Sequence, residues 1–237
     1  MNSSAFFVMA IPATVAVAGG ALAALWKPSH AMRSLIQHFA AGVILAALAV
    51  ELLPDIGKEH ATKTVVLGAF AAGSLFMYGL KLWTERLEHR GRGAAQGAAV
   101  GLLVATFVDV ATDGFIIGAG FAAGTETGTV LALGLSVELL FLGLAVASDR
   151  LTGWRIVGVT AALGLTVLVF AVLGSVLLSG ASAAVLAGTL SFSAAALLYL
   201  VTEELLMEAH QVEEKPVATL VLFGGFLTFW AIQLMGH

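Results

Sequence analysis

The sequence contains no cysteine, which excludes disulfides and thiolate metal sites. Any bound metal must therefore use carboxylate, imidazole, amide, hydroxyl or water ligands. Charge is also scarce, since only 11% of residues are charged while 59% are hydrophobic, and the mean hydropathy is +1.00. This composition excludes an ordinary soluble domain and predicts a polytopic membrane protein. No ATP-binding motif is present, so any transport is expected to follow gradients.

The apolar runs predict an all-α polytopic membrane protein with eight transmembrane helices in one domain, residues 1–237. The N-terminus lacks the positive region of a secretory signal. The first apolar run has about 22 residues, enough to cross a bilayer, so we interpret it as a helix. The expected spans are 5–26, 34–53, 64–83, 94–121, 128–147, 154–178, 182–202 and 217–235.

The distribution of basic residues predicts the orientation in the membrane. Nine of the eleven Lys and Arg residues fall in the odd-numbered connections or at the span ends beside them, and the exceptions are Lys58 and Lys63. Cytoplasmic loops collect basic residues. The odd connections are therefore expected in the cytoplasm and both termini outside, in a cell (inner) membrane.

Two similar segments end the second and seventh spans. The second ends in Glu51-Leu-Leu-Pro-Asp55 and the seventh in Glu204-Leu-Leu-Met-Glu208. Five spans separate them, which puts the two endings on opposite faces, as in a 3+2+3 inverted repeat. The alternative is a coincidence between two leucine-rich helix ends that carry acids.

Three acidic residues are predicted near the middle of the fourth and fifth spans: Asp109, Asp113 and Glu138. Each costs roughly 2.5–3.5 kcal/mol at membrane depth, so something must offset them. Asp109 and Asp113 are one helical turn apart on one face, and Thr106 could add a hydroxyl there. With no basic residue expected at this depth, a cation site is favoured over a hydrogen-bonded cluster of protonated acids.

Further polar residues suggest a route to and from these acids. Glu51 and Asp55, with Glu59 and His60, would form an acidic entrance that concentrates cations. An acidic loop without function is the alternative. At the cytoplasmic side, a possible exit path comprises His38, Glu203, Glu204, Glu208 and His210. The alternative is that His38 is a satisfied interfacial histidine and that the others form a solvated helix end.

Two of these stretches resemble the ZIP (Zrt/Irt-like) divalent metal transporters. His38-Phe-Ala-Ala-Gly42, followed by Glu51-Leu-Leu-Pro-Asp55, is similar to the second helix of that family, with its H-F-x-x-G and L-L-P-E-like motifs. The stretch Tyr199-Leu-Val-Thr-Glu-Glu-Leu-Leu-Met-Glu-Ala-His210 is similar to the seventh helix, Y-V-x-x-E-E-L-x-P-E-A-H, with Met207 in place of proline. The resemblance implies an eight-helix, 3+2+3 bundle with a metal route between helices 2, 4, 5 and 7.

The fourth and fifth helices diverge from the family at the positions that bind metal. Asp109-Val-Ala-Thr-Asp113-Gly114 stands where the family has H-N-x-P-E-G. Aligning Gly143-Leu-Ala-Val146 puts Glu138 at the histidine of the fifth helix. The resemblance thus implies Asp109, Asp113 and Glu138 as ligands. Aliphatic residues that cannot ligate metal occupy the other polar positions, namely Val110, Leu139 and Leu142. An all-oxygen set suits Mn2+ or Mg2+ better than a histidine-containing set, and zinc remains possible.

The resulting hypothesis is a transporter of divalent metal cations of the zinc, manganese and iron class, directed into the cytoplasm. The protein is not expected to be an enzyme. It is also expected to need no cofactor, since the metal ion is the transported substrate. Expected partners are the ion and the lipid bilayer, with a second copy in a homodimer as a further candidate, and no nucleic acid. Two alternatives stay open, a non-transporting relative that senses metal or assembles with a partner, and an intramembrane aspartyl protease.

Overall fold

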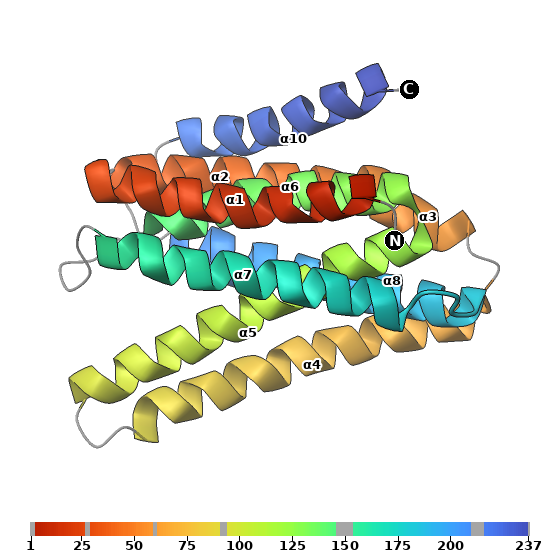
Figure 1. The fold of residues 1–237 in the computed structure, drawn as a ribbon, viewed down its shortest axis with the longest axis horizontal. Helices are drawn as coiled ribbons and strands as arrows, with labels where there is room; N and C mark the ends of the chain where they lie inside the picture. Colours follow the sequence, from red (N-terminus) through yellow and green to blue (C-terminus); the bar gives the residue numbers. More distant parts are fainter. Residues whose placement is uncertain are drawn as a thin grey trace.

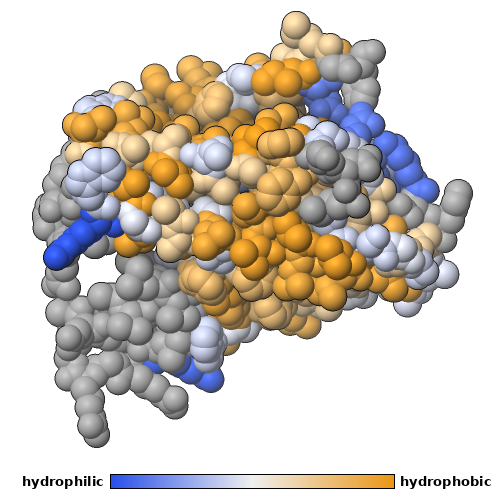
Figure 2. All heavy atoms as spheres, viewed as in Figure 1, coloured by the Kyte–Doolittle hydropathy of each residue, from blue (hydrophilic) through white to orange (hydrophobic). Residues whose placement is uncertain are grey.

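The computed structural model describes residues 3–26, 29–58, 61–90, 94–145, 154–209 and 216–236. Within these ranges all regular structure is helical, and eight helices are long and apolar enough to cross a membrane. The eight spans expected from sequence are thereby confirmed as helices of spanning length. Figure 2 shows hydrophobic side chains over the middle of one face and hydrophilic ones towards both ends.

The described residues form ten α-helices and two short π-helices. In order, these are α1 (Ser3–Leu25), α2 (His30–Ala47), η1 (Leu48–Leu52), α3 (Leu53–Lys58), α4 (Lys63–Arg90), α5 (Ala94–Ala123), α6 (Thr125–Ala145), α7 (Trp154–Leu177), α8 (Ala183–Leu200), η2 (Val201–Leu205), α9 (Leu206–Ala209) and α10 (Val217–Gly236). Figure 1 shows both termini at one end of the bundle, here called the termini end. The α3–α4, α5–α6 and α7–α8 connections lie at the same end, as eight crossings require.

The second span continues further than its sequence predicted. Helical structure was expected to stop at residue 53, but it continues through η1 and α3 to Lys58. The Leu53 N–H bonds to the Leu48 carbonyl, five residues back. Pro54 follows directly, where the usual ladder is already interrupted, so its missing N–H disrupts less than it would within a regular helix.

Two segments of the chain have the same local construction. Both α2 and α8 have 18 residues and begin after a serine N-cap. The Ser29 hydroxyl accepts a bond from the Met32 N–H at 3.3 Å, and the Ser182 hydroxyl accepts one from the Val185 N–H at 3.4 Å. Such caps satisfy an N–H that the helix leaves without a partner. Each helix then passes into a five-residue π-helix, η1 or η2.

Glycines allow the long helices to pack closely. The most extensive contacts join α5 with α7, α1 with α6, α2 with α10, α1 with α7, and α4 with α8. A Cβ added to Gly118 of α5 would lie 2.3 Å from the Ala171 carbonyl oxygen of α7, and one added to Gly19 of α1 would lie 2.4 Å from the Leu140 oxygen of α6. Close backbone approach at small residues is how apolar helices associate in membranes.

Candidate metal centre

The central hairpin of α5 and α6 positions the acidic residues. Only Gly124 separates the two helices. Its N–H bonds to the Gly120 oxygen at 2.8 Å, and its carbonyl accepts from the Gly128 N–H at 3.0 Å. A side chain at Gly128 would collide with Phe121, because an added Cβ would lie 2.4 Å from its ring. The tight turn therefore brings α5 and α6 side by side with their acids at similar depth.

Asp109 and Asp113 of α5 meet Glu138 of α6 in one cluster. Each of the three acids offers a carboxylate oxygen, and these oxygens all lie within 4.8 Å of one another. Asp113 is 1% exposed and Glu138 6% exposed, while Asp109 is half-buried at the edge of the group. The structure thus brings together the three residues that sequence analysis singled out. Their spacing can accommodate one cation with ligands from two helices.

Apolar packing surrounds this cluster. Val110 and Leu139 are completely buried in the hydrophobic core. At Gly114, the residue after Asp113, α7 approaches so closely that an added Cβ would lie 2.4 Å from the Val167 oxygen. Carboxylates in such surroundings are expensive to ionise unless a cation accompanies them.

Two threonines of α5, Thr106 and Thr112, are close to the acidic residues in sequence. The Thr112 hydroxyl donates to the Val108 oxygen of its own helix at 2.9 Å. Thr106, the possible additional ligand, is half-buried one turn before Asp109. Its participation stays a prediction.

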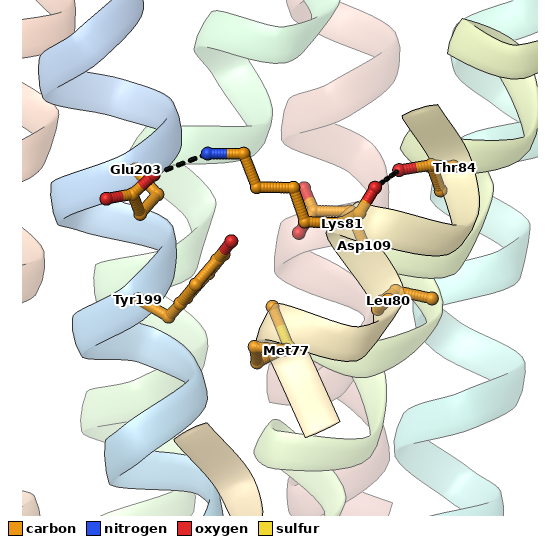
Figure 3. Close-up of a pocket in the computed structure, with 7 residues that line it drawn as sticks. All are labelled: Met77, Leu80, Lys81, Thr84, Asp109, Tyr199 and Glu203. Atoms are coloured by element: carbon orange, nitrogen blue, oxygen red, sulfur yellow. Dashed lines mark hydrogen bonds and ion pairs between the residues drawn. The ribbon is translucent and has the colours of Figure 1, made fainter. Parts of the chain in front are cut away.

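At the end of the bundle opposite the termini, a pocket of about 90 Å³ connects Asp109 to Glu203. Glu203 of η2 accepts a bond from the Lys81 ammonium of α4 at 2.5 Å. Figure 3 shows these residues together with Tyr199 and Thr84. Sequence analysis placed Lys81 at the end of the expected span 64–83, beside the third connection, and expected no basic residue at the depth of the acids. In the structure Lys81 belongs to α4 and pairs with Glu203 at the edge of the pocket that Asp109 also lines.

Of the other exit candidates, only the His38 side chain falls within the described set. His38 is buried in α2, and its Nδ1 donates to the Ser34 oxygen at 2.8 Å, which matches the satisfied histidine that sequence analysis considered. His38 does not belong to the acidic cluster. Glu204 and Glu208 lie in η2 and α9, with side chains outside the described set, and His210 falls outside the described residues.

The entrance candidates lie at the termini end, and both are bound to neighbours. Glu51 of η1 is buried and accepts a bond from the Gln233 amide of α10 at 2.5 Å. Asp55 of α3 pairs with Lys58 at 2.6 Å and accepts a bond from the Thr127 hydroxyl of α6. The other two expected members, Glu59 and His60, lie outside the described residues.

Sequence reasoning missed Lys81, Tyr199 and Gln233 as neighbours of the acidic residues. Signals were available for two of them. Lys81 falls inside its expected span of 64–83, and Gln233 is a lone amide inside the expected span of 217–235. Polar groups inside apolar spans generally face a partner. Tyr199 carried no comparable signal.

Comparison with protein-family models finds no match to this chain, and comparison with curated proteins finds no relative. The resemblance to ZIP transporters therefore depends on the short motifs of the second and seventh spans. Functional inference depends on the chemistry of the acidic cluster and on the contacts around it.

Proposed function

We propose that this protein is a membrane transporter for divalent metal cations and that Asp109, Asp113 and Glu138 bind the ion. One observation carries the proposal, namely three carboxylates from two neighbouring helices whose oxygens lie within 4.8 Å of one another. If all three ionise, their charges repel one another in an apolar interior. A dication would offset most of that cost, which is roughly 2.5–3.5 kcal/mol per acid.

The ligand chemistry favours harder cations within the zinc, manganese and iron class. All three side chains offer oxygen, and no cysteine exists in the chain. Oxygen sets suit Mn2+ and Mg2+, whereas imidazole and thiolate select more strongly for zinc and copper. Manganese is therefore the first ion to test, with zinc beside it.

The proposal includes a 3+2+3 inverted repeat, in which α1 to α4 correspond to α7 to α10 and the α5–α6 hairpin lies between them. The matched caps and π-helices of the second and seventh spans support it. So do the packing pairs, since α1 with α6 corresponds to α7 with α5, and α2 with α10 corresponds to α8 with α4. Repeats of this kind place the substrate near the midplane between the two halves.

The proposed route starts near Glu51 and Asp55, passes the acidic cluster and leaves past Glu203. Basic residues in the odd connections favour both termini outside a cell (inner) membrane and an exit into the cytoplasm. Movement of the two halves against each other would expose the cluster to one side at a time.

Uptake of Mn2+ and Zn2+ into proteoliposomes tests this function. Asp113→Ala should abolish uptake and the binding of Mn2+ to purified protein, while helical content stays unchanged. Thr228→Ala is the control, because Thr228 is exposed on α10 and its hydroxyl bonds only within that helix, to the Gly224 oxygen. Its uptake should remain within about twofold, as expected for a surface change away from the site.

Other results would redirect the assignment. Wild-type uptake in Asp113→Ala would refute the proposed ligands. Mn2+ binding without uptake would favour a sensing or assembly protein. Asp113 and Glu138 come from different helices, as a pair of catalytic acids requires, so cleavage of a transmembrane peptide without metal binding would favour a protease.

A further inference from the structure

A single ion pair spans the pocket beside Asp109. The Lys81 ammonium of α4 lies 2.5 Å from Oε2 of Glu203 in η2. Both residues line the same pocket as Asp109, a member of the acidic cluster. Figure 3 shows Lys81 reaching across this space from α4 towards Glu203, with Asp109 behind its side chain. A cation that moves from Asp109 towards Glu203 therefore meets the ammonium group.

The pocket is suited to ion passage in size and lining. At about 90 Å³ it has room for several water molecules. Asp109, Glu203 and the Tyr199 side chain provide oxygen atoms, while Met77 and Leu80 close its apolar side. A partly hydrated ion could thus keep oxygen neighbours along this short path.

The ion pair between Lys81 and Glu203 is of a kind in which either charge can change its partner. The Lys81 and Glu203 side chains are 35% and 39% exposed and line a pocket, so neither charge is enclosed in the packed core. Lysine is a flexible, strongly hydrated point charge and has no fixed fork geometry. Glu203 belongs to a π-helix, a local irregularity that recurs at functional sites.

We propose that Lys81 is a tethered counter-cation that closes this end of the route in the absence of metal. Its ammonium holds Glu203 and blocks access to Asp109. A dication that leaves the acidic cluster competes for the Glu203 carboxylate, displaces the ammonium and opens the pocket. The inference rests on the proposed function, because the displacing ion is the transported metal.

The absence of cysteine makes the closure directly measurable. Met77 lines the pocket and is buried, so Met77→Cys introduces one thiol behind the ion pair. Its reaction with a charged thiol reagent is measured in nanodiscs, where both faces are accessible. Thr202→Cys is the control for reagent access and for any direct effect of metal on the thiol, because Thr202 is exposed one residue from Glu203.

The closure predicts a defined pattern of labelling rates. Combining Met77→Cys with Lys81→Met or with Glu203→Gln should raise the rate about three- to fivefold, as loss of a partly exposed ion pair allows. Lys81→Arg should keep the slow rate, since it retains the charge. Added Mn2+ should accelerate labelling of the Met77→Cys protein by a similar factor and should have no effect when Lys81→Met or Asp113→Ala is also present.

Failure of the closure can be distinguished from failure of the proposed function. Equal labelling of the Met77→Cys protein with and without Lys81→Met would refute the closure, whatever the uptake assay gives. Mn2+ binding and uptake without faster labelling would refute displacement of Lys81 while the transport proposal stands. No Mn2+ binding to the unaltered protein would refute both, and the binding measurement alone would reveal it.

Discussion

Two helix pairs that correspond in the proposed repeat pack differently in this protein. In the first pair, α2 and α10 approach at two glycines, since a Cβ on Gly42 would lie 2.0 Å from the Leu222 oxygen and one on Gly225 would lie 2.2 Å from the Phe39 oxygen. In the second pair, α8 and α4 approach closely at Gly73, where the corresponding distance to the Phe192 oxygen is 2.7 Å. The first pair is therefore the tighter one.

The polar contacts of the two pairs differ in the same direction. Buried Glu51 bonds to the neutral amide of Gln233 in the first pair. In the second pair, the half-exposed Glu203 bonds to the ammonium of Lys81 beside a pocket. A buried hydrogen bond fixes two helices together, whereas a partly exposed ion pair beside a pocket can exchange partners. The α4–α8 side is thus the better candidate for movement in the proposed transport cycle.

The largest expected effect comes from the cluster that lies between the two pairs. Glu138→Gln keeps the size of the side chain and removes one of the three proposed carboxylate ligands, so uptake at low Mn2+ should fall about 100-fold or more, beyond the loss typical of an outer-shell partner. Uptake into proteoliposomes as a function of Mn2+ concentration measures it. An unchanged uptake curve would show that Glu138 is not a ligand.

Alanine in place of the contact glycines compares the packing of the pairs. Gly42→Ala should destabilise by about 3 kcal/mol and Gly73→Ala by about 1 kcal/mol, because overpacking costs more where backbone must move. Thermal unfolding followed by helical circular dichroism measures both. The control is Gly224→Ala in α10, where an added Cβ has nothing within 4 Å, and it should be neutral or stabilise by up to about 1 kcal/mol. Equal losses at Gly42 and Gly73 would remove the proposed difference in tightness.

Removing one polar contact from each pair gives a smaller contrast. Gln233→Leu takes a donor from a buried carboxyl and should destabilise by about 1 kcal/mol or somewhat more. Lys81→Met breaks a partly exposed pair and should cost about 0.5 kcal/mol. The same unfolding assay measures them. A larger loss for Lys81→Met would mean that the ion pair is structural, in conflict with its proposed opening.

The helix caps should give the smallest effects and no contrast. Ser29→Ala and Ser182→Ala each remove one hydrogen bond of 3.3–3.4 Å from the start of an 18-residue helix. Each should cost about 0.5–1 kcal/mol. Clearly unequal values in the unfolding assay would argue against equivalence of the two segments.

Much of the candidate site could be predicted because it depends on local spacing. Asp109 and Asp113 are neighbours on any α-helix, and burial of acids in apolar spans is visible from composition. Glu138 could be grouped with them because consecutive spans commonly pack together. The ion pair of Lys81 with Glu203 could not be predicted, since these residues are far apart in sequence and the helix ends were misplaced by several residues.

By itself, the sequence determined the eight apolar helices and the presence of acids within them, because helix formation in an apolar solvent satisfies backbone groups within each span. Only the tertiary structure decided which helices contact each other, that α10 supplies Gln233 to Glu51, and that α4 supplies Lys81 to Glu203. The physical reason is that side chains of similar hydropathy can pack in many ways. The fit of glycine surfaces and the few polar contacts select one arrangement.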